Sequence, residues 1–253
     1  MNTLRIGTRG SRLALWQANW VADSLRALAE APEVELVTIQ TLGDQDRDSR
    51  LSEMGSTGVF TKALEEALLE DRIDLAVHSL KDVETELAPG TTLGAFLPRA
   101  DARDALLCRE AGSLEELPEG ARVGTSSLRR TAWLKRVRPD LAIVPLRGNV
   151  PTRVSRLQEG EMEAMVLAAA GLTRLGMDEH ITAYLDPERF LPAPGQGIVT
   201  VQIRADDPAT ARHVSRLDHP PSRAWPPAPP PFLITLGRTS ELHYQCLSVV
   251  EVV

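Results

Sequence analysis

The stretch VGTSSLRR, residues 123–130, has residue types that suit an anion-binding site. A helix predicted to begin at Leu128 presents free N–H groups at its N-terminus. The guanidiniums of Arg129 and Arg130 add bidentate donors for carboxylate or phosphate. The polar residues just before this helix, which belong to the same predicted site, are Thr125, Ser126 and Ser127. An N-capped helix with a solvated basic face explains the same residues.

Positive charge is concentrated around this stretch. Residues 122–156 contain nine lysines and arginines and one acidic residue, so the segment carries +8 in a chain whose net charge is -7. The rest of the chain carries -15. An acidic protein with 4% aromatic residues lacks the basic charge and stacking side chains of nucleic-acid-binding domains. Small anionic ligands fit this composition better.

A second candidate lies in IDLAVHSLKDVE, residues 73–84. Its apolar first half predicts a strand buried between helix layers. Lys81 and Asp82 follow the end of that strand, where ligands approach open α/β sheets. A carboxylate in an arginine-lined cleft can stabilise a cation or move a proton. A surface turn is the alternative for the Lys-Asp pair, and His78 is interpreted as a polar residue at a strand end.

The N-terminal stretch LRIGTRGSRLALWQ supplies a third group of candidates. Residues 4–8 predict a strand, and apolar residues recur at helical spacing from Leu13, with Ser11 as the helix cap. Arg9, Ser11 and Gln17 can therefore project from the carboxyl edge of a parallel sheet. A capped helix beside a solvated arginine is the alternative.

Further candidates follow predicted strands between residues 140 and 197. Arg147 ends the strand predicted in PDLAIVPLRG, and Arg153 lies in a helix whose first turn contains Pro151. Arg174 carries less weight, because single arginines on helices are mostly solvated. Gln196, in the crossing segment LPAPGQG, and Gln17 are also weaker candidates.

Composition excludes several classes of protein. No run of 18 apolar residues predicts a membrane helix, and the N-terminus lacks a signal peptide, so we expect a cytoplasmic protein. Cys108 and Cys246 form neither a disulfide framework nor a metal cluster. The five histidines show no metal-ligand spacing, and we expect no metal.

Alternating strand and helix patterns predict an α/β fold. Residues 43–58 form a long polar loop, which is either a lid or a surface insertion. Strands are predicted at 4–8, 34–41, 73–79, 104–108, 121–125, within 139–148, from 164 and at 198–204; helices are predicted from 13, at 59–72, from 128 to about 138, from 149, from 169 and at 207–217.

Six blocks of the sequence resemble, in order and spacing, the signature blocks of the porphobilinogen deaminase (hydroxymethylbilane synthase) family. The resemblance covers residues 3 to about 217. The blocks are IGTRGSRLALWQ at 6–17, VHSLKDVE at 77–84, VGTSSLRR at 123–130, LRGNVPTR at 146–153, AAAGLTRLG at 168–176 and LPAPGQG at 191–197.

The resemblance implies an α/β fold with two lobes similar to those of type II periplasmic binding proteins, and an active site in the cleft between them. Domain 1 would be residues 1–97 plus 198–217, and domain 2, inserted into it, residues 98–197. The family's third α+β domain would be missing or replaced by a divergent proline-rich tail at 218–253. Seven prolines between Pro220 and Pro231 are expected to exclude a helix there.

The resemblance also implies a reaction and its residues. Four porphobilinogen units would be joined head to tail with loss of ammonia, through an electrophilic azafulvene, to give hydroxymethylbilane for porphyrin and haem biosynthesis. Asp82 would be catalytic, by stabilising the developing positive charge and moving protons. Carboxylates of substrate and cofactor would be held by Arg9, Ser11, Lys81, Thr125, Ser126, Ser127, Arg129, Arg130, Arg147 and Arg153.

The resemblance implies a dipyrromethane cofactor, which the family attaches to a cysteine of its third domain. No cysteine stands at a matching position, and Cys246 is the remaining candidate. Cys108 lies in an apolar strand, where a thiol is usually inert. We therefore expect this chain, as written, to be a defective or inactive deaminase. We also expect a monomer that binds porphobilinogen and neither nucleic acid nor membrane.

Two alternative functions remain open on the sequence. A non-catalytic two-lobed anion-binding module, of the solute-receptor type, explains the arginines and the missing third domain. A phosphate-handling transferase could use the GTSS residues at a helix N-terminus equally well.

Overall fold

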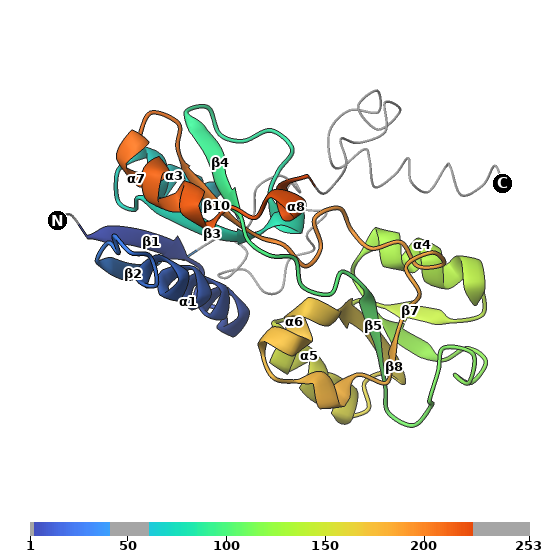
Figure 1. Cartoon of the computed structure of the whole chain (residues 1–253). Helices are drawn as coiled ribbons and strands as arrows, with labels where there is room; N and C mark the ends of the chain where they lie inside the picture. Colours follow the sequence, from blue (N-terminus) through green and yellow to red (C-terminus); the bar gives the residue numbers. More distant parts are fainter. Residues whose placement is uncertain (1–2, 41–60, 225–253) are drawn as a thin grey trace. The chain divides into compact units, whose positions relative to one another are not determined.

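A computed structural model describes residues 3–40 and 61–224 of the chain. These residues form two compact units, each with its own sheet and core. Unit 1 contains the described residues as far as Arg99 and those from Ile198 onward, and unit 2 runs from Ala100 to Gly197. The chain leaves unit 1, builds unit 2 and returns (Figure 1). The long polar loop at 43–58 and residues 225–253 lie outside the described residues.

Unit 1 is built on a 5-stranded sheet with the strand order β2-β1-β3-β10-β4. β1 is parallel to β2 and β3, whereas β10 is antiparallel to β3 and β4. The expected parallel sheet is therefore mixed, because the returning chain enters the sheet at the edge where β3 ends and must run back along it. The strands are β1 (Leu4–Thr8), β2 (Val34–Thr38), β3 (Leu75–Ser79), β4 (Thr91–Phe96) and β10 (Val199–Arg204).

Helices cover both faces of this sheet. α1 (Arg12–Arg26) and α7 (Pro208–Val214) share one core with Leu75 and Val77, and α3 (Lys62–Leu69) shares the other with Ala76. Successive side chains of a strand point to opposite faces. A strand with a core on each side therefore has consecutive apolar residues, as β3 does at Leu75, Ala76 and Val77. None of the described helices is long and apolar enough to cross a membrane.

Unit 2 repeats this plan with the strand order β7-β6-β8-β5-β9. β6 is parallel to β7 and β8, and β5 is antiparallel to β8 and β9. α4 covers one face, and α5 and α6 cover the other. The elements are β5 (Asp104–Cys108), β6 (Arg122–Gly124), α4 (Leu128–Val137), β7 (Ala142–Val144), α5 (Val150–Gln158), β8 (Ala164–Ala168), α6 (Ala169–Arg174) and β9 (Ala183–Tyr184).

The two units also share local details that follow from this common plan. β1 contains Gly7 and β6 contains Gly124, and a Cβ at either position would lie only 2.2 or 2.3 Å from a packed side chain. Each glycine is followed by a buried threonine and then by a serine that caps the next helix. The strand, turn and helix from β1 to α1 and from β6 to α4 are therefore built alike.

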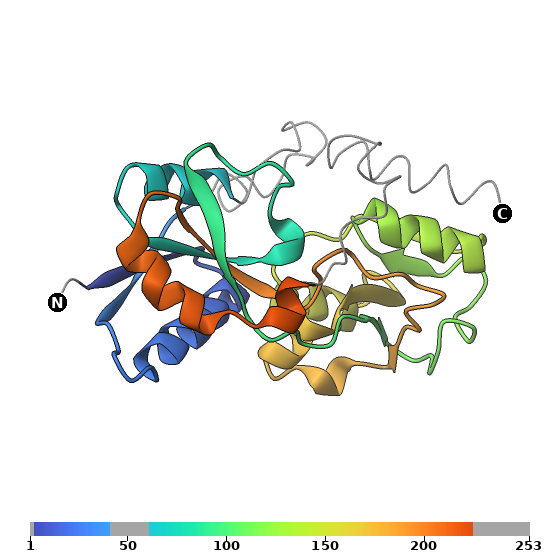
Figure 2. The ribbon, with the colours of Figure 1, turned by 45° about the horizontal axis from the view of Figure 1, so that its top comes forward.

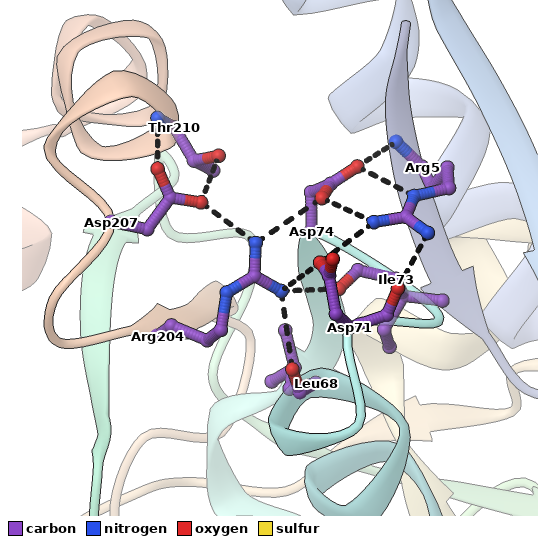
Figure 3. A network of polar contacts seen from close by, with 8 residues as sticks. All are labelled: Arg5, Leu68, Asp71, Ile73, Asp74, Arg204, Asp207 and Thr210. Carbon is purple, nitrogen blue, oxygen red and sulfur yellow. Dashed lines mark hydrogen bonds and ion pairs between the residues drawn. The ribbon is translucent and has the colours of Figure 1, made fainter.

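In each unit an arginine and a carboxylate form an ion pair, here called the charged tie, at the end of the sheet away from the candidate residues. In unit 1, Asp74 accepts hydrogen bonds from the backbone N, Nε and Nη2 of Arg5 at 2.8, 3.0 and 2.8 Å, and Arg204 Nη2 lies 3.2 Å from it (Figure 3). In unit 2, Glu163 accepts the same three groups of Arg122. The tie joins β1 to the residue before β3 in unit 1, and β6 to the residue before β8 in unit 2. It joins neighbouring strands at their amino ends, whereas the predicted ligand-binding residues follow the carboxyl ends.

The structure corrects two expectations about the chain beyond residue 84. Residues 91–96, for which the sequence analysis predicted no strand or helix, form β4. They pair with β10, the strand formed by the chain after it returns from unit 2. The proline-rich segment was expected to contain no helix, yet Pro220–Arg223 form the short helix α8. Its prolines occupy the first turn, where the missing N–H needs no partner.

Residues 218–224, assigned to the divergent tail, pack on unit 1 (Figure 2). Phe96 donates its backbone N–H to Asp218, and His219 donates its own to the carbonyl of Phe96. Arg223 reaches the carbonyl of Gly94. These contacts tie the segment to β4, so the folded part of unit 1 extends beyond the boundary expected at residue 217.

Candidate functional site

In unit 1 the candidate residues from the first block follow β1. Ser11 caps α1, because its Oγ accepts a hydrogen bond from Ala14 N at 3.3 Å. Arg9, half buried, lies in the turn between strand and helix. Thr8, fully buried, hydrogen bonds to the carbonyl of Arg9 at 3.2 Å and so holds that turn. The expected cap is confirmed.

The second block lies beside the first, since β3 is the parallel neighbour of β1. Lys81 and Asp82 form a short 3-10 turn directly after β3, and both are exposed. Leu80 N donates to the carbonyl of Ile198, which ties the turn to the entry of β10. Gln17 is buried and donates to Ser79 Oγ at 2.9 Å, joining α1 to the end of β3.

His78 lies at the end of β3, as the sequence predicted. It is buried, and burial, together with the charge of Arg9, lowers its pKa to about 4. Its Nε2 and the Oε1 of Gln202 are buried atoms without a well-directed hydrogen bond. Gln202 donates to Glu65 and Thr91 at 2.8 Å each. The buried side chains of His78 and Gln202 thus lie in the sheet that precedes the turn with Asp82.

In unit 2 the three hydroxyl residues of the third block shape the N-terminus of α4. Ser127 caps the helix, with its Oγ 3.4 Å from Arg130 N. Thr125 is buried and accepts a hydrogen bond from Ser127 N at 3.1 Å. Ser126 Oγ bonds both the N–H and the carbonyl of Leu146 at 3.0 Å. All three hydroxyls make bonds within the protein, so the turn they form is fixed.

Arg129 and Arg130 converge on one buried carboxylate, that of Asp104 at the start of β5. Arg129 Nη1 lies 2.8 Å from Oδ2, and Arg130 donates to Oδ1 from Nη2 at 2.7 Å and from Nε at 3.1 Å. Asp104 is fully buried. Burial alone would raise the pKa of its carboxyl, but the two guanidiniums hold that pKa below its ordinary value.

The remaining candidates of unit 2 differ in their surroundings. Arg147 is half buried, and its guanidinium makes no ion pair with any residue that the structure describes. Arg153 donates its Nε to the carbonyl of Gly148 at 2.7 Å. Gln196 is buried and donates to Ala102 O at 2.7 Å and Asp104 Oδ1 at 3.0 Å.

Arg174 was expected to be solvated, and this expectation is wrong. The side chain is buried and donates from Nη2 to the carbonyl of Gly197 at 2.7 Å. Burial lowers its pKa to about 10. α6 follows β8 directly, and the arginine on its last turn contacts Gly197 at the end of the crossing segment LPAPGQG. Helical spacing alone does not reveal this position.

Asp104 and Ser79 were missed by the sequence analysis. Asp104 precedes the apolar run of β5 and was counted only as part of a strand. Ser79 lies in the signature block HSLKD without standing out from it. A signal for Asp104 was present in its place at a strand terminus, since a charged residue there must either face water or find partners.

No cluster of three or more His, Cys, Asp or Glu that could hold a metal ion occurs within residues 3–40 and 61–224. Cys108 is half buried at the end of β5 opposite Asp104, and burial raises the pKa of its thiol. Cys246 lies outside the described residues. Unit 1 thus offers an exposed carboxylate beside Arg9 and Lys81, and unit 2 a group of guanidiniums at a helix N-terminus.

Known proteins share both the sequence and the fold. The family model for the porphobilinogen deaminase, dipyromethane cofactor binding domain, matches residues 4–212. Porphobilinogen deaminase of Syntrophomonas wolfei is 47% identical over 251 residues, 99% of this chain and 82% of that protein. The enzyme of Roseiflexus castenholzii is 46% identical over 250 residues, with the same coverage. These two matches continue past residue 217, where the resemblance was expected to end.

Porphobilinogen deaminase of Pelobacter propionicus is 49% identical over 217 residues, 86% of this chain and 70% of that protein. Among solved structures, a periplasmic substrate-binding protein of an ABC transporter from Coxiella burnetii aligns with a TM-score of 0.51 at 14% identity, over 87% of this chain and 93% of that chain. The methionine-binding protein MetQ aligns with a TM-score of 0.51 at 16% identity, over 85% and 89%. The expected two-lobed α/β fold is confirmed.

Proposed function

This chain belongs to the porphobilinogen deaminase family, and we propose that Asp82 is the catalytic carboxylate of its reaction. The family are transferases that condense four porphobilinogen units, with loss of ammonia, to hydroxymethylbilane. This is a step of tetrapyrrole and haem biosynthesis. The two alternatives, a non-catalytic anion-binding module and a phosphate-handling transferase, are not favoured, since relatives at 46–49% identity are porphobilinogen deaminases.

The observation that carries the proposal is the state of the Asp82 carboxylate. It is exposed directly after β3, and within the described part of the chain it makes no hydrogen bond or ion pair. Two acids elsewhere in unit 1 are engaged, Asp74 with Arg5 and Arg204, and Asp207 with Arg204. A carboxylate left ready at the carboxyl end of a central strand is placed to meet a ligand.

The chemistry asks for such a group. As ammonia leaves porphobilinogen, positive charge develops on the pyrrole and its methylene carbon. An anionic oxygen stabilises that charge, can accept a hydrogen bond from the pyrrole N–H, and can carry the proton that the new bond releases. Asp82 would perform these three tasks. Lys81, its neighbour, would bind a substrate carboxylate instead.

The basic and hydroxyl residues would bind the carboxylates of porphobilinogen and of the growing chain. Several carboxylates cannot be removed from water unpaired, and guanidinium forks match them bidentately. Arg147 supports this proposal best, because its half-buried guanidinium has no protein partner among the described residues. The proposed set is Arg9, Ser11, Lys81, Thr125, Ser126, Ser127, Arg129, Arg130, Arg147 and Arg153. Gln17, Arg174 and Gln196 are weaker candidates.

The donor set also fits the family's dipyrromethane cofactor, whose arms are carboxylates. The helix N-terminus capped by Ser127, together with guanidiniums of the proposed set, would hold those arms, since guanidiniums and free N–H groups are what carboxylates prefer. When bound, the cofactor supplies the primer to which substrate units are added. Cys108 does not fit as its attachment point, because it lies at the far end of β5 and its thiol pKa is raised.

We also propose that units 1 and 2 are domains 1 and 2 of the family, and that the protein works as a cytoplasmic monomer without nucleic acid or membrane. The sequence resemblance supports this proposal. Size-exclusion chromatography with light scattering, with and without porphobilinogen, measures the oligomeric state.

The catalytic assignment is tested with Asp82→Asn and the control Glu86→Gln, an exposed acid in the same loop. With each protein compared in its cofactor-loaded form, we expect Asp82→Asn to fold as the wild type and to lose on the order of a hundredfold or more in the rate of porphobilinogen consumption. Glu86→Gln should keep the wild-type rate. Equal rates for all three proteins would remove Asp82 from the mechanism.

A further inference from the structure

Asp104 is the most constrained charged residue near the proposed ligand-binding arginines. Its side chain is fully buried, and Arg129, Arg130 and Gln196 reach it from two different parts of unit 2. One partner would be enough to neutralise a carboxylate at a strand terminus, and Asp104 has three. The additional partners indicate that this carboxylate orients the side chains around it.

The two arginines are held unequally. Arg130 uses all three of its nitrogens within the protein: Nε and Nη2 on Asp104, and Nη1 on the carbonyl of Val166 at 3.1 Å. Arg129 uses only Nη1, which contacts Asp104 and the carbonyl of Leu191. Its Nε and Nη2 make no hydrogen bond with the residues that the structure describes. Arg129 therefore keeps one side of its fork for a ligand.

The charge of the cluster points the same way. Two guanidiniums and one ionised carboxylate leave a net charge of one positive unit in a nearly buried place, with Arg129 and Arg130 side chains 13% and 10% exposed. Burial lowers the pKa of Arg129, although its pairing with Asp104 opposes that shift. A buried net charge is costly unless an anion meets it. The cluster is thus suited to one ligand carboxylate.

We propose that Asp104 is a positioning residue, which fixes Arg130 completely and fixes Arg129 by one nitrogen, so that the remaining edge of Arg129 is aimed at a carboxylate of porphobilinogen or of the growing chain. Gln196 holds Asp104 from the side of the crossing segment. The inference rests on the proposed ligand-binding role of Arg129. It makes Arg130 a support for its neighbour.

The test is a double-mutant cycle read out as the affinity for porphobilinogen, measured by calorimetry on the full chain. Arg129→Ala and Asp104→Asn should each weaken binding by about tenfold or more, because each removes an oriented charged hydrogen bond. The double variant should bind about as weakly as Arg129→Ala alone, since Asp104 acts only through that guanidinium. Asp101→Asn is the control, because Asp101 pairs with Arg103 and touches neither Arg129 nor Arg130. It should bind as the wild type.

Each contrary outcome has a separate meaning. Unchanged affinity in Arg129→Ala would overturn the proposed ligand role and this inference with it. Weaker binding in Arg129→Ala, with wild-type affinity in Asp104→Asn or with additive losses in the double variant, would overturn the inference alone.

A second variant covers the case in which Asp104→Asn does not fold. Asp104→Asn combined with Arg130→Gln removes one charge of each sign and keeps the net charge of the cluster, and such an exchange is tolerated better than removal of one partner. We expect a folded protein in which Arg129 is no longer oriented and affinity falls about tenfold. Wild-type affinity in this variant would overturn the positioning role.

Discussion

Asp74 offers a test of how much a buried charged tie contributes to unit 1. Its carboxylate accepts four hydrogen bonds, three from Arg5 and one from Arg204, and its side chain is 12% exposed (Figure 3). Breaking a buried ion pair typically costs about 3–5 kcal/mol. The Arg5 side chain is 33% exposed and regains some hydration, and asparagine still accepts the backbone N–H of Arg5. We therefore expect Asp74→Asn to lower the free energy of unfolding by about 2–3 kcal/mol.

Glu163→Gln in unit 2 is the matched comparison, since Glu163 accepts the same three groups of Arg122. Its side chain is 34% exposed and that of Arg122 is 46% exposed. Although Arg122 lowers the pKa of Glu163 to about 2, solvent screening at such exposure reduces the stability that this shift represents. We expect a loss of about 1 kcal/mol or less.

The measurement is thermal unfolding followed by circular dichroism at pH 7, where about 4 °C corresponds to each kcal/mol. Asp74→Asn should then melt roughly 8–12 °C lower than the wild type and Glu163→Gln no more than about 4 °C lower. Arg5 and Arg204 hold the pKa of Asp74 below its ordinary value, so its contribution is present above about pH 4 and is lost as the pH falls further. Equal losses in the two variants would refute the argument from burial.

Three further predictions concern the site. Arg147→Lys should weaken porphobilinogen binding nearly as much as Arg147→Ala, because a point charge cannot replace the fork; calorimetry that finds the lysine variant equal to wild type would place Arg147 on a solvated face. His78 has its pKa lowered to about 4, so it destabilises the fold as the pH falls from about 6.5 to 4. His78→Asn should flatten the pH dependence of the free energy of unfolding across that interval, and an unchanged pH dependence would contradict the assignment to His78. Intact mass spectrometry should show an unmodified chain, whereas a dipyrromethane adduct mapped to Cys246, with tetrapyrrole formation, would contradict this expectation.

Most elements were predictable because local signals agreed with the fold. Ser11, Ser127 and Asn149 each cap a helix that begins at the next residue, and continuous apolar runs mark β3, β5 and β8. The strand at 91–96 was missed because its pairing with β10 joins residues over a hundred positions apart. Sheet order and the direction of β10 depend on that return. No short window of sequence contains them.

The site was predictable in its residue types and not in its internal pairing. A run of basic residues indicates an anion-binding site, but it does not show which arginines already have a protein partner. Asp104 lies 25 positions before Arg129, at the first residue of an apolar strand. Only the antiparallel placement of β5 beside β8 brings its carboxylate under α4. Arg130, which the sequence presents as the equal of Arg129, is thereby committed to the protein.

The common plan of the two units shows where their sequences differ at equivalent strand ends. The turn after β3 carries Lys81 and Asp82, whereas β8 runs directly into α6, which begins with Ala169 and Ala170. A serine caps both the helix after β1 and the helix after β6, but only the latter has paired arginines in its first turn over a buried carboxylate. The two roles that we propose for carboxylates thus belong to different strand ends of the common plan. Asp82, exposed after β3, would stabilise a cation, and Asp104, buried beneath α4, would orient Arg129.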